Sequence, residues 1–176
     1  MSVRVLNPLR RFAENENGSV VVPFAMWMPV FIGLVLATIE VGTVTIRSTA
    51  LERALDETVR EVRLGNAGDQ TAIKQSICNR AAVLPDCLDR LQLEMVRLDM
   101  RNWSNIPNRA DCVDTSEVFT PNRAFQNAGG SEVMFLRACF KYRPITPAGN
   151  LSANLPEDDE GFTAITASSA FVTEPS

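Results

Sequence analysis

The longest uninterrupted run of apolar residues lies near the start of the chain, from Ser19 to Ile39 (SVVVPFAMWMPVFIGLVLATI). None of these residues is charged, and Glu40 follows them directly. As a helix rising about 1.5 Å per residue, the run would measure roughly 30 Å, the thickness of the hydrocarbon core of a bilayer. A surface helix of a water-soluble domain needs a polar face, and this run has none. The pattern predicts a membrane-spanning helix over residues 19–40, with a fully buried core helix as the alternative.

The pattern changes after Glu40, where charged residues return. Apolar residues then recur every three or four positions, which marks one face of an amphipathic helix. The positions on this face are Leu51, Ala54, Leu55, Thr58, Val59 and Val62. Gly65 lies where a helix C-cap is usual. Residues 41–68 are therefore predicted to continue the membrane helix, giving one helix of about 45 residues.

The remaining residues, 69–176, are predicted to form one α+β domain. Asp69 is placed to cap a helix from Gln70 to about Val83, and Pro85 breaks it. Inward positions of this helix are Ile73, Ile77 and Val83. The predicted fold class is thus α+β, with a long N-terminal helix that crosses the membrane and continues beyond it, followed by a small antiparallel sheet with packed helices.

Three later segments show the apolar–polar alternation of strands, namely residues 91–100, 131–142 and 162–172. In the first, the phase of the alternation changes at Met95-Val96, which predicts a β-bulge. The second is apolar enough to be the central strand of the sheet. Residues 102–131 have the composition of a loop, and residues 149–161 that of an acidic linker.

Charge and composition exclude several functions. Residues 1–18 carry three Arg and two Glu, whereas residues 47–176 carry 14 Lys or Arg and 18 Asp or Glu. Such an acidic domain lacks the basic face that nucleic acid requires. The chain has no histidine, which removes Ser-His-Asp and Cys-His catalysis and most zinc sites. The acidic run at 157–160 lacks the ligand spacing of a calcium loop, so no metal and no cofactor are predicted.

All four cysteines, Cys78, Cys87, Cys112 and Cys139, follow the predicted membrane helix. No two are spaced as C-x-x-C, and an even number in one domain indicates two disulfides in an oxidising compartment. Three pairings are open, of which local closure favours Cys78 with Cys87 and Cys112 with Cys139; four reduced, buried cysteines are the alternative.

The cysteines also set the predicted orientation, because the Arg residues on the two sides of the membrane helix nearly balance. The N-terminus is placed in the cytoplasm and the C-terminal domain on the other, extracytoplasmic side of the membrane. A cleaved secretory signal is the competing interpretation, although its apolar core would be only about 7–15 residues long.

A short Arg-containing tail is followed by an acidic Glu-Asn-Gly-Ser turn and then by Val-Val-Pro-Phe-Ala, an internal proline and Ile-Glu-Val-Gly before a charged helix. Together these features resemble the TadE-like family, the minor pseudopilins and assembly proteins of tight-adherence (Flp-type) pili in bacteria. The resemblance covers about residues 10–64. It implies a structural, non-catalytic protein of the bacterial inner membrane, whose partners are other pilus or pseudopilin subunits, the assembly machinery and a prepilin peptidase.

The resemblance also implies a candidate processing site between Gly18 and Ser19. Substrates of this peptidase usually carry a glutamate at the fifth residue after the cut, where this chain has Pro23. Proline cannot supply the buried charge that pairs with the terminal amine of a neighbouring subunit. Cleavage without the usual filament entry, and an uncleaved assembly factor, are both open; a plain helix-start turn is the structural alternative at Gly18.

Four more positions are candidates for helix packing or assembly. Pro29 should kink the membrane helix, and Gly33 and Gly42 offer small surfaces to another helix. Glu40 should lie near the outer interface, where it marks the end of the span or pairs with another subunit. The alternative to the pilus role is a membrane-tethered periplasmic enzyme or ligand-binding domain, against which the missing catalytic motifs count.

Overall fold

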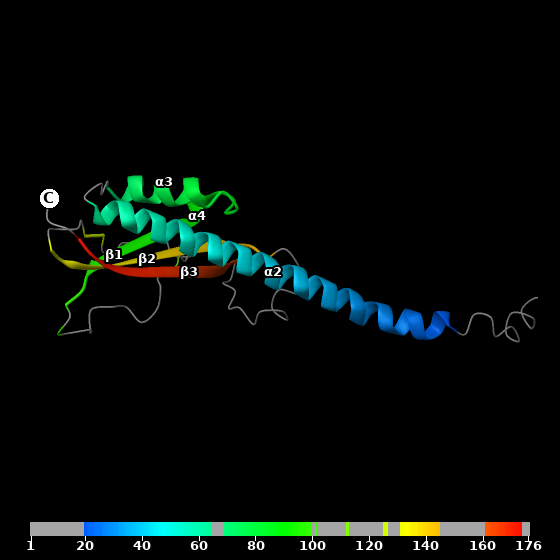
Figure 1. Cartoon of the computed structure of the whole chain (residues 1–176). Coiled ribbons are helices and arrows are strands. Elements are labelled where there is room, and N and C mark those ends of the chain that lie inside the picture. The colour runs from blue at the N-terminus through cyan, green and yellow to red at the C-terminus, as the bar shows by residue number, and fades with distance from the viewer. Residues whose placement is uncertain are drawn as a thin grey trace, which may run out of the picture.

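The computed structural model describes residues 20–64, 69–99, 101, 112, 125–126, 131–144 and 161–173. In chain order, its elements are α2 (Val21–Arg63), α3 (Gln70–Arg80), α4 (Cys87–Arg90), β1 (Leu91–Arg97), β2 (Val133–Tyr142) and β3 (Thr163–Val172). The sheet, α3 and α4 gather around the C-terminal half of α2, while its N-terminal half projects away from them (Figure 1). The predicted α+β fold class, a long apolar helix followed by a small antiparallel sheet with packed helices, is confirmed.

Helix α2 is continuous over 43 residues, which confirms the prediction of one long helix. All the residues predicted to form its apolar face are buried, namely Leu51, Ala54, Leu55, Thr58, Val59 and Val62. Its N-cap position is held by Val20, which makes no side-chain cap, and its C-cap by Leu64. Gly65, which the sequence predicts near the C-cap, lies outside the described residues.

Helix α3 begins as predicted. The carboxylate of Asp69 accepts a hydrogen bond from the backbone N–H of Ala72 at 3.0 Å, which satisfies one of the free donors of the first turn. Ile73 and Ile77 are buried against the rest of the domain. One side of α3 is thereby fixed on α2 and the sheet.

The predicted end of this helix at Val83 is wrong. Helix α3 ends at Arg80, and the side chain of Val83 is 49% exposed. Because a proline disfavours the helical conformation in the residue before it, Pro85 holds Leu84 out of a helix. Leu84 is buried and takes the core position expected for Val83. The short helix α4 follows this turn and was not predicted.

The three strands form an antiparallel sheet in the order β1-β2-β3, so β2 is central, as its apolar sequence predicts. The bulge predicted at Met95-Val96 is wrong: pairing runs without interruption from Leu91 opposite Phe140 to Arg97 opposite Met134. Met95 and Val96 point to opposite faces of a regular strand, and both are buried. Two consecutive apolar residues therefore appear in the sequence without any bulge in the strand.

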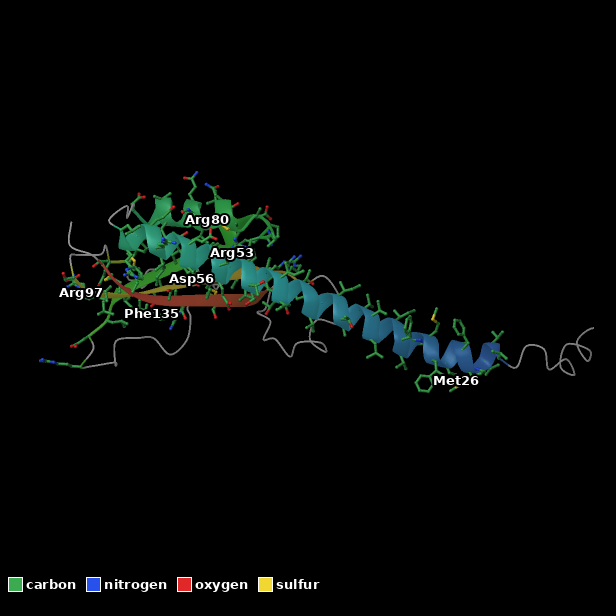
Figure 2. The ribbon with its side chains drawn as sticks, viewed as in Figure 1. Met26, Arg53, Asp56, Arg80, Arg97 and Phe135 are labelled. Atoms are coloured by element: carbon green, nitrogen blue, oxygen red, sulfur yellow. A yellow bond between two sulfur atoms is a disulfide. The ribbon has the colours of Figure 1, made fainter. Side chains whose placement is uncertain are left out.

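The two faces of the sheet differ. The face under α2 and α3 carries the core side chains of the strands, which include Leu91, Leu93, Met95, Met134, Leu136, Ala138, Phe140, Tyr142, Ile165, Ala167 and Phe171. On the other face, Arg137 pairs with Glu94 at 3.4 Å and lies over the ring of Phe135 at 5.0 Å. Figure 2 shows Phe135 on the side of the sheet away from the helices.

Two disulfides tie the domain together. Cys78 of α3 is bonded to Cys87 of α4, with the two Cα atoms 5.6 Å apart. Cys112 is bonded to Cys139 on the outer face of β2, with a Cα separation of 5.5 Å. These are the two pairs that local closure favours.

Candidate functional site: the exposed helix and its junction with the domain

The N-terminal half of α2 is apolar and uncovered. The side chain of Trp27 is 70% exposed and that of Leu34 is 64% exposed. Within the described residues, α2 is the one helix long and apolar enough to cross a membrane, and none of its most apolar window, of mean hydropathy 2.1, is buried. Exposing so much apolar surface to water would cost considerable free energy. An uncovered apolar surface of this extent is typical of a segment that lies in lipid. This half of α2 has the properties of a single-pass membrane anchor.

The prolines and glycines singled out for helix packing all fall on α2. Pro23 lies in its first turn, where the missing N–H costs little. Pro29 lies inside the helix, which runs on without a break; the kink expected there stays a prediction. Beside the Cα atoms of Gly33 and Gly42 there is open space: apart from the adjacent residues and the nearby backbone of α2 itself, no atom comes within 4 Å of where a Cβ would be. Their role in helix packing also stays a prediction.

Threonine hydroxyls along α2 are satisfied within the helix. Thr38 donates to the carbonyl of Leu34 at 2.8 Å, and Thr45 donates to that of Val41 at 2.8 Å. Thr43 and Thr49 make the same bond to the carbonyl four residues before them. A hydroxyl bonded in this way needs no water, so this stretch of helix can sit at the edge of a bilayer.

The exposed half of α2 ends at Glu40, which is only 1% exposed. Helical spacing places Glu40, Val44, Arg47 and Leu51 on one side of α2, the side that packs on the sheet further along. Val44 is partly buried against the core, and Leu51 is fully buried within it. Burial against the domain therefore starts at Glu40, in the first turn after the uncharged segment.

Tyr142, at the end of β2, meets this side of α2. The guanidinium of Arg47 lies over its ring, 4.7 Å from the centroid, in cation–π geometry. Burial raises the pKa of the Tyr142 hydroxyl, the negative charge of Glu40 raises it further, and Arg47 opposes the shift. The hydroxyl is buried and has no hydrogen-bond partner in the part of the chain that the structure describes.

We refer to Glu40, Arg47 and Tyr142 as the junction cluster. Of its members, the sequence analysis singled out only Glu40. Arg47 carries a detectable signal, because it lies seven residues after Glu40 and four before Leu51, spacings that keep all three on one helical face. Tyr142 carries no such signal, because only the pairing of β2 with the other strands brings it to α2.

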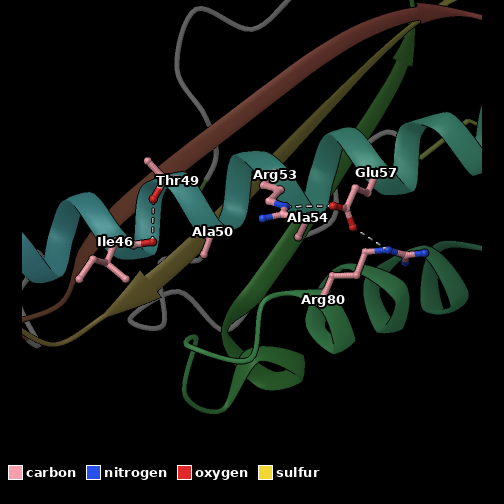
Figure 3. Close-up of a pocket in the computed structure, with 7 residues that line it drawn as sticks. All are labelled: Ile46, Thr49, Ala50, Arg53, Ala54, Glu57 and Arg80. Carbon is pink, nitrogen blue, oxygen red and sulfur yellow. Dashed lines mark hydrogen bonds and ion pairs between the residues drawn. The ribbon is translucent and has the colours of Figure 1, made fainter.

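On its other side, α2 forms an open groove with α3, with a volume of about 500 Å³ (Figure 3). Its lining residues are Ile46, Thr49, Ala50, Arg53, Ala54, Glu57 and Arg80. Glu57 pairs with Arg53 at 3.0 Å and with Arg80 at 3.4 Å, so the charges in the groove are largely matched within the domain. Among the residues that can be placed, no three His, Cys, Asp or Glu side chains cluster as a metal site requires.

The candidate processing site, Gly18 and Ser19, lies outside the described residues.

Comparison with known proteins supports the family resemblance. The family model described as TadE-like protein matches residues 18–60, which comprise nearly all of α2 and the residues just before it. No curated protein and no solved structure matches the chain. The TadE-like family is a structural family associated with tight-adherence (Flp) pilus systems. The resemblance of this chain to the TadE-like family is thereby confirmed over residues 18–60.

Proposed function

We propose that this chain is a membrane-anchored minor pseudopilin or assembly factor of the tight-adherence (Flp) pilus, with a structural and non-catalytic role. One observation carries the proposal: the helix matched by the TadE-like model is apolar and uncovered over residues 21–39, and it continues without a break into a folded domain. An uncovered helix joined rigidly to a domain suits a subunit that packs against other helices in the membrane and presents its domain outside.

In this proposal residues 1–18 form a cytoplasmic tail and residues 19–40 span the inner membrane. Residues 41–68 extend the helix, and residues 69–176 form the periplasmic domain. The two disulfides support this orientation, since such bonds persist in the periplasm and are rare in the cytoplasm. The partners would be other pilus subunits and the assembly machinery, with a prepilin peptidase acting at Gly18-Ser19.

The open space beside Gly33 and Gly42 supports a role for α2 in packing against neighbouring helices. A bulky side chain at these positions would keep another helix at a distance. Gly42→Leu is therefore expected to reduce piliation, whereas Ala72→Leu, at an exposed position of α3 away from this helix surface, serves as the matched control.

The proposal is tested in cells by deleting the gene and scoring pili by electron microscopy. Loss of pili, restored by the intact chain and poorly restored by Gly42→Leu, is expected. Normal pili after deletion would overturn the proposal. Intact mass of the protein from native membranes then separates the two roles: a chain that begins at Ser19 is a processed pseudopilin, and one that begins at Met1 or Ser2 is an uncleaved assembly factor.

A further inference from the structure

The two edges of the sheet are not equivalent. At the outer edge of β1, Phe125 forms a bridge with Met95, and the backbone N–H of Gln126 donates to the carbonyl of Met95 at 3.0 Å. The side-chain oxygen of Gln126 also accepts a bond from the backbone N–H of Arg97 at 3.2 Å. On the side of β3 away from β2, no backbone hydrogen bond is made by the described residues. The edge of β3 is thus open within the described structure.

Strand β3 also lacks the devices that usually protect such an edge. Its ten residues, Thr163–Val172, include no charged residue and no proline, and they pair with β2 in a register without a bulge. Natural edge strands are commonly short, bulged or marked by lysine or proline, because an unprotected edge accepts another strand. An edge of this length without any of these devices is typical of a strand that is covered in the assembled protein.

Beside this edge, α2 presents two acidic side chains. Glu52 and Asp56 are exposed and, together with Leu55, form one wall of a groove of about 300 Å³. The opposite wall is made by Thr166, Ala167 and Ser168 of β3. Figure 2 shows Asp56 on the side of α2 that faces the sheet, away from Arg80 and α3.

The spacing of the two acids matches that of a strand. Glu52 and Asp56 are one helical turn apart, which separates them by about 6 Å along the helix axis. Alternate residues of a β-strand, which point to the same face, are about 6.6 Å apart. A strand added to β3 would therefore bring two alternate side chains opposite Glu52 and Asp56.

We infer that the open edge of β3 and the groove lined by Glu52 and Asp56 form a docking site for an extended segment of another protein. This segment adds a strand to β3 and carries Lys or Arg at two alternate positions, which face the two acids. Backbone hydrogen bonds to β3 give the segment its affinity, and the acidic pair gives it register and selectivity. A second copy of this chain fits less well, because its own β3 has no basic residue to offer.

The test uses the full chain in native membranes, with the photoreactive amino acid p-benzoylphenylalanine in place of Ser168 in the groove. The matched control carries it in place of Gln75, which is exposed on α3. After irradiation, the adducts are digested and the attached peptides are identified by mass spectrometry. We expect the groove position, and not the control, to yield one extended segment of another protein with Lys or Arg at alternate positions.

Two charge reversals then test the role of the acids. Asp56→Lys should lower the yield of that adduct about tenfold, because attraction becomes repulsion. Asp89→Lys, on the exposed surface of α4, should leave the yield unchanged. A third variant, Thr166→Lys with Ser168→Lys, blocks the edge itself and should abolish the adduct. Its control, Thr71→Lys with Gln75→Lys on the exposed side of α3, should leave the adduct unchanged; in both, a probe in place of Ala170 of β3 reports it.

Any other pattern overturns the inference. Adducts to β3 of a second copy would assign the edge to self-association, and adducts within the same chain would show that one of its own segments covers it. No adduct above the control, or equal losses with Asp56→Lys and Asp89→Lys, would also reject the site. None of these readouts depends on piliation, so the outcome is independent of the proposed pilus role.

Discussion

The two halves of α2 share one continuous backbone but have opposite surroundings. In residues 21–39 no side chain is buried, although the segment has no charged residue. In the stretch from Leu51 to Val62, the apolar side chains of α2 are buried in the core of the domain, and the charged ones are exposed. Because the backbone hydrogen bonds are made within the helix in both halves, the side chains alone decide where each half is stable. One helix can thus be a membrane segment at one end and part of a domain core at the other.

The junction cluster marks the change from one half to the other. Glu40 and Arg47 are the first charged residues after the uncharged segment, and both lie on the side of α2 that turns towards Tyr142. Glu40 is buried here, and Arg47 lies over the ring of Tyr142, so contact with the domain begins at the first charged residues of the helix.

The largest effect is expected when the same substitution, Leu to Ala, is made in each half of α2 and the two variants are compared. Leu51→Ala removes a fully buried side chain and should lower the free energy of unfolding of the domain by about 2–5 kcal/mol. Leu34→Ala, on the exposed half, should change it by less than about 0.5 kcal/mol. Denaturant unfolding of the full chain in detergent micelles measures both. Equal effects would mean that α2 is one structural unit throughout.

A smaller effect is expected at the junction. Arg47→Ala removes a cation–π contact and the packing of the Arg stem, which should cost about 1–2 kcal/mol. Arg53→Ala removes an exposed ion pair with Glu57 and should cost less than about 0.5 kcal/mol. The same unfolding measurement applies, and a loss at Arg53 as large as that at Arg47 would contradict the assignment of the boundary to the junction cluster.

A smaller effect near neutral pH than that of Arg47→Ala is expected at Tyr142. Its raised pKa means that the unfolded chain ionises this tyrosine first, at its ordinary value of 10.0. The neutral hydroxyl of Tyr142 therefore makes its full contribution to the free energy of unfolding below pH 10.0, and this contribution is lost as the pH rises through the pKa of the folded state. Tyr142→Phe should remove this alkaline loss and change stability at neutral pH by less than about 1 kcal/mol, since the hydroxyl has no hydrogen-bond partner among the described residues.

Tyr142 is also a direct probe, because the chain has one tyrosine. Its phenolate absorbance in an alkaline titration reports this pKa without interference from other tyrosines. Glu40→Gln should lower the pKa of Tyr142, and Arg47→Ala should raise it further. A tyrosine that titrates at its ordinary value in the intact chain would show that the junction cluster is not formed.

The helices and strands were largely predictable, because their signals are local. The apolar face of α2 and the Asp69 cap both follow from the order of neighbouring residues. One error arose where a distant part of the chain decides. Val96 is buried on the outer face of the sheet, which made a regular strand look bulged. The error at Val83 was local instead: α3 stops at Arg80, and Leu84, which Pro85 holds out of a helix, fills the core position expected for Val83.

The sequence by itself determined the long helix, its division into an uncharged half and an amphipathic half, and the α+β class of the domain. These follow from periodicity, which a helix or strand expresses wherever it is placed. Only the tertiary structure decided that Tyr142 lies over Arg47, and that the uncharged strand β3 stands at the edge of the sheet beside Glu52 and Asp56. Such neighbours come from segments far apart in the chain, so the pairing of strands and the packing of α2 on the sheet bring them together.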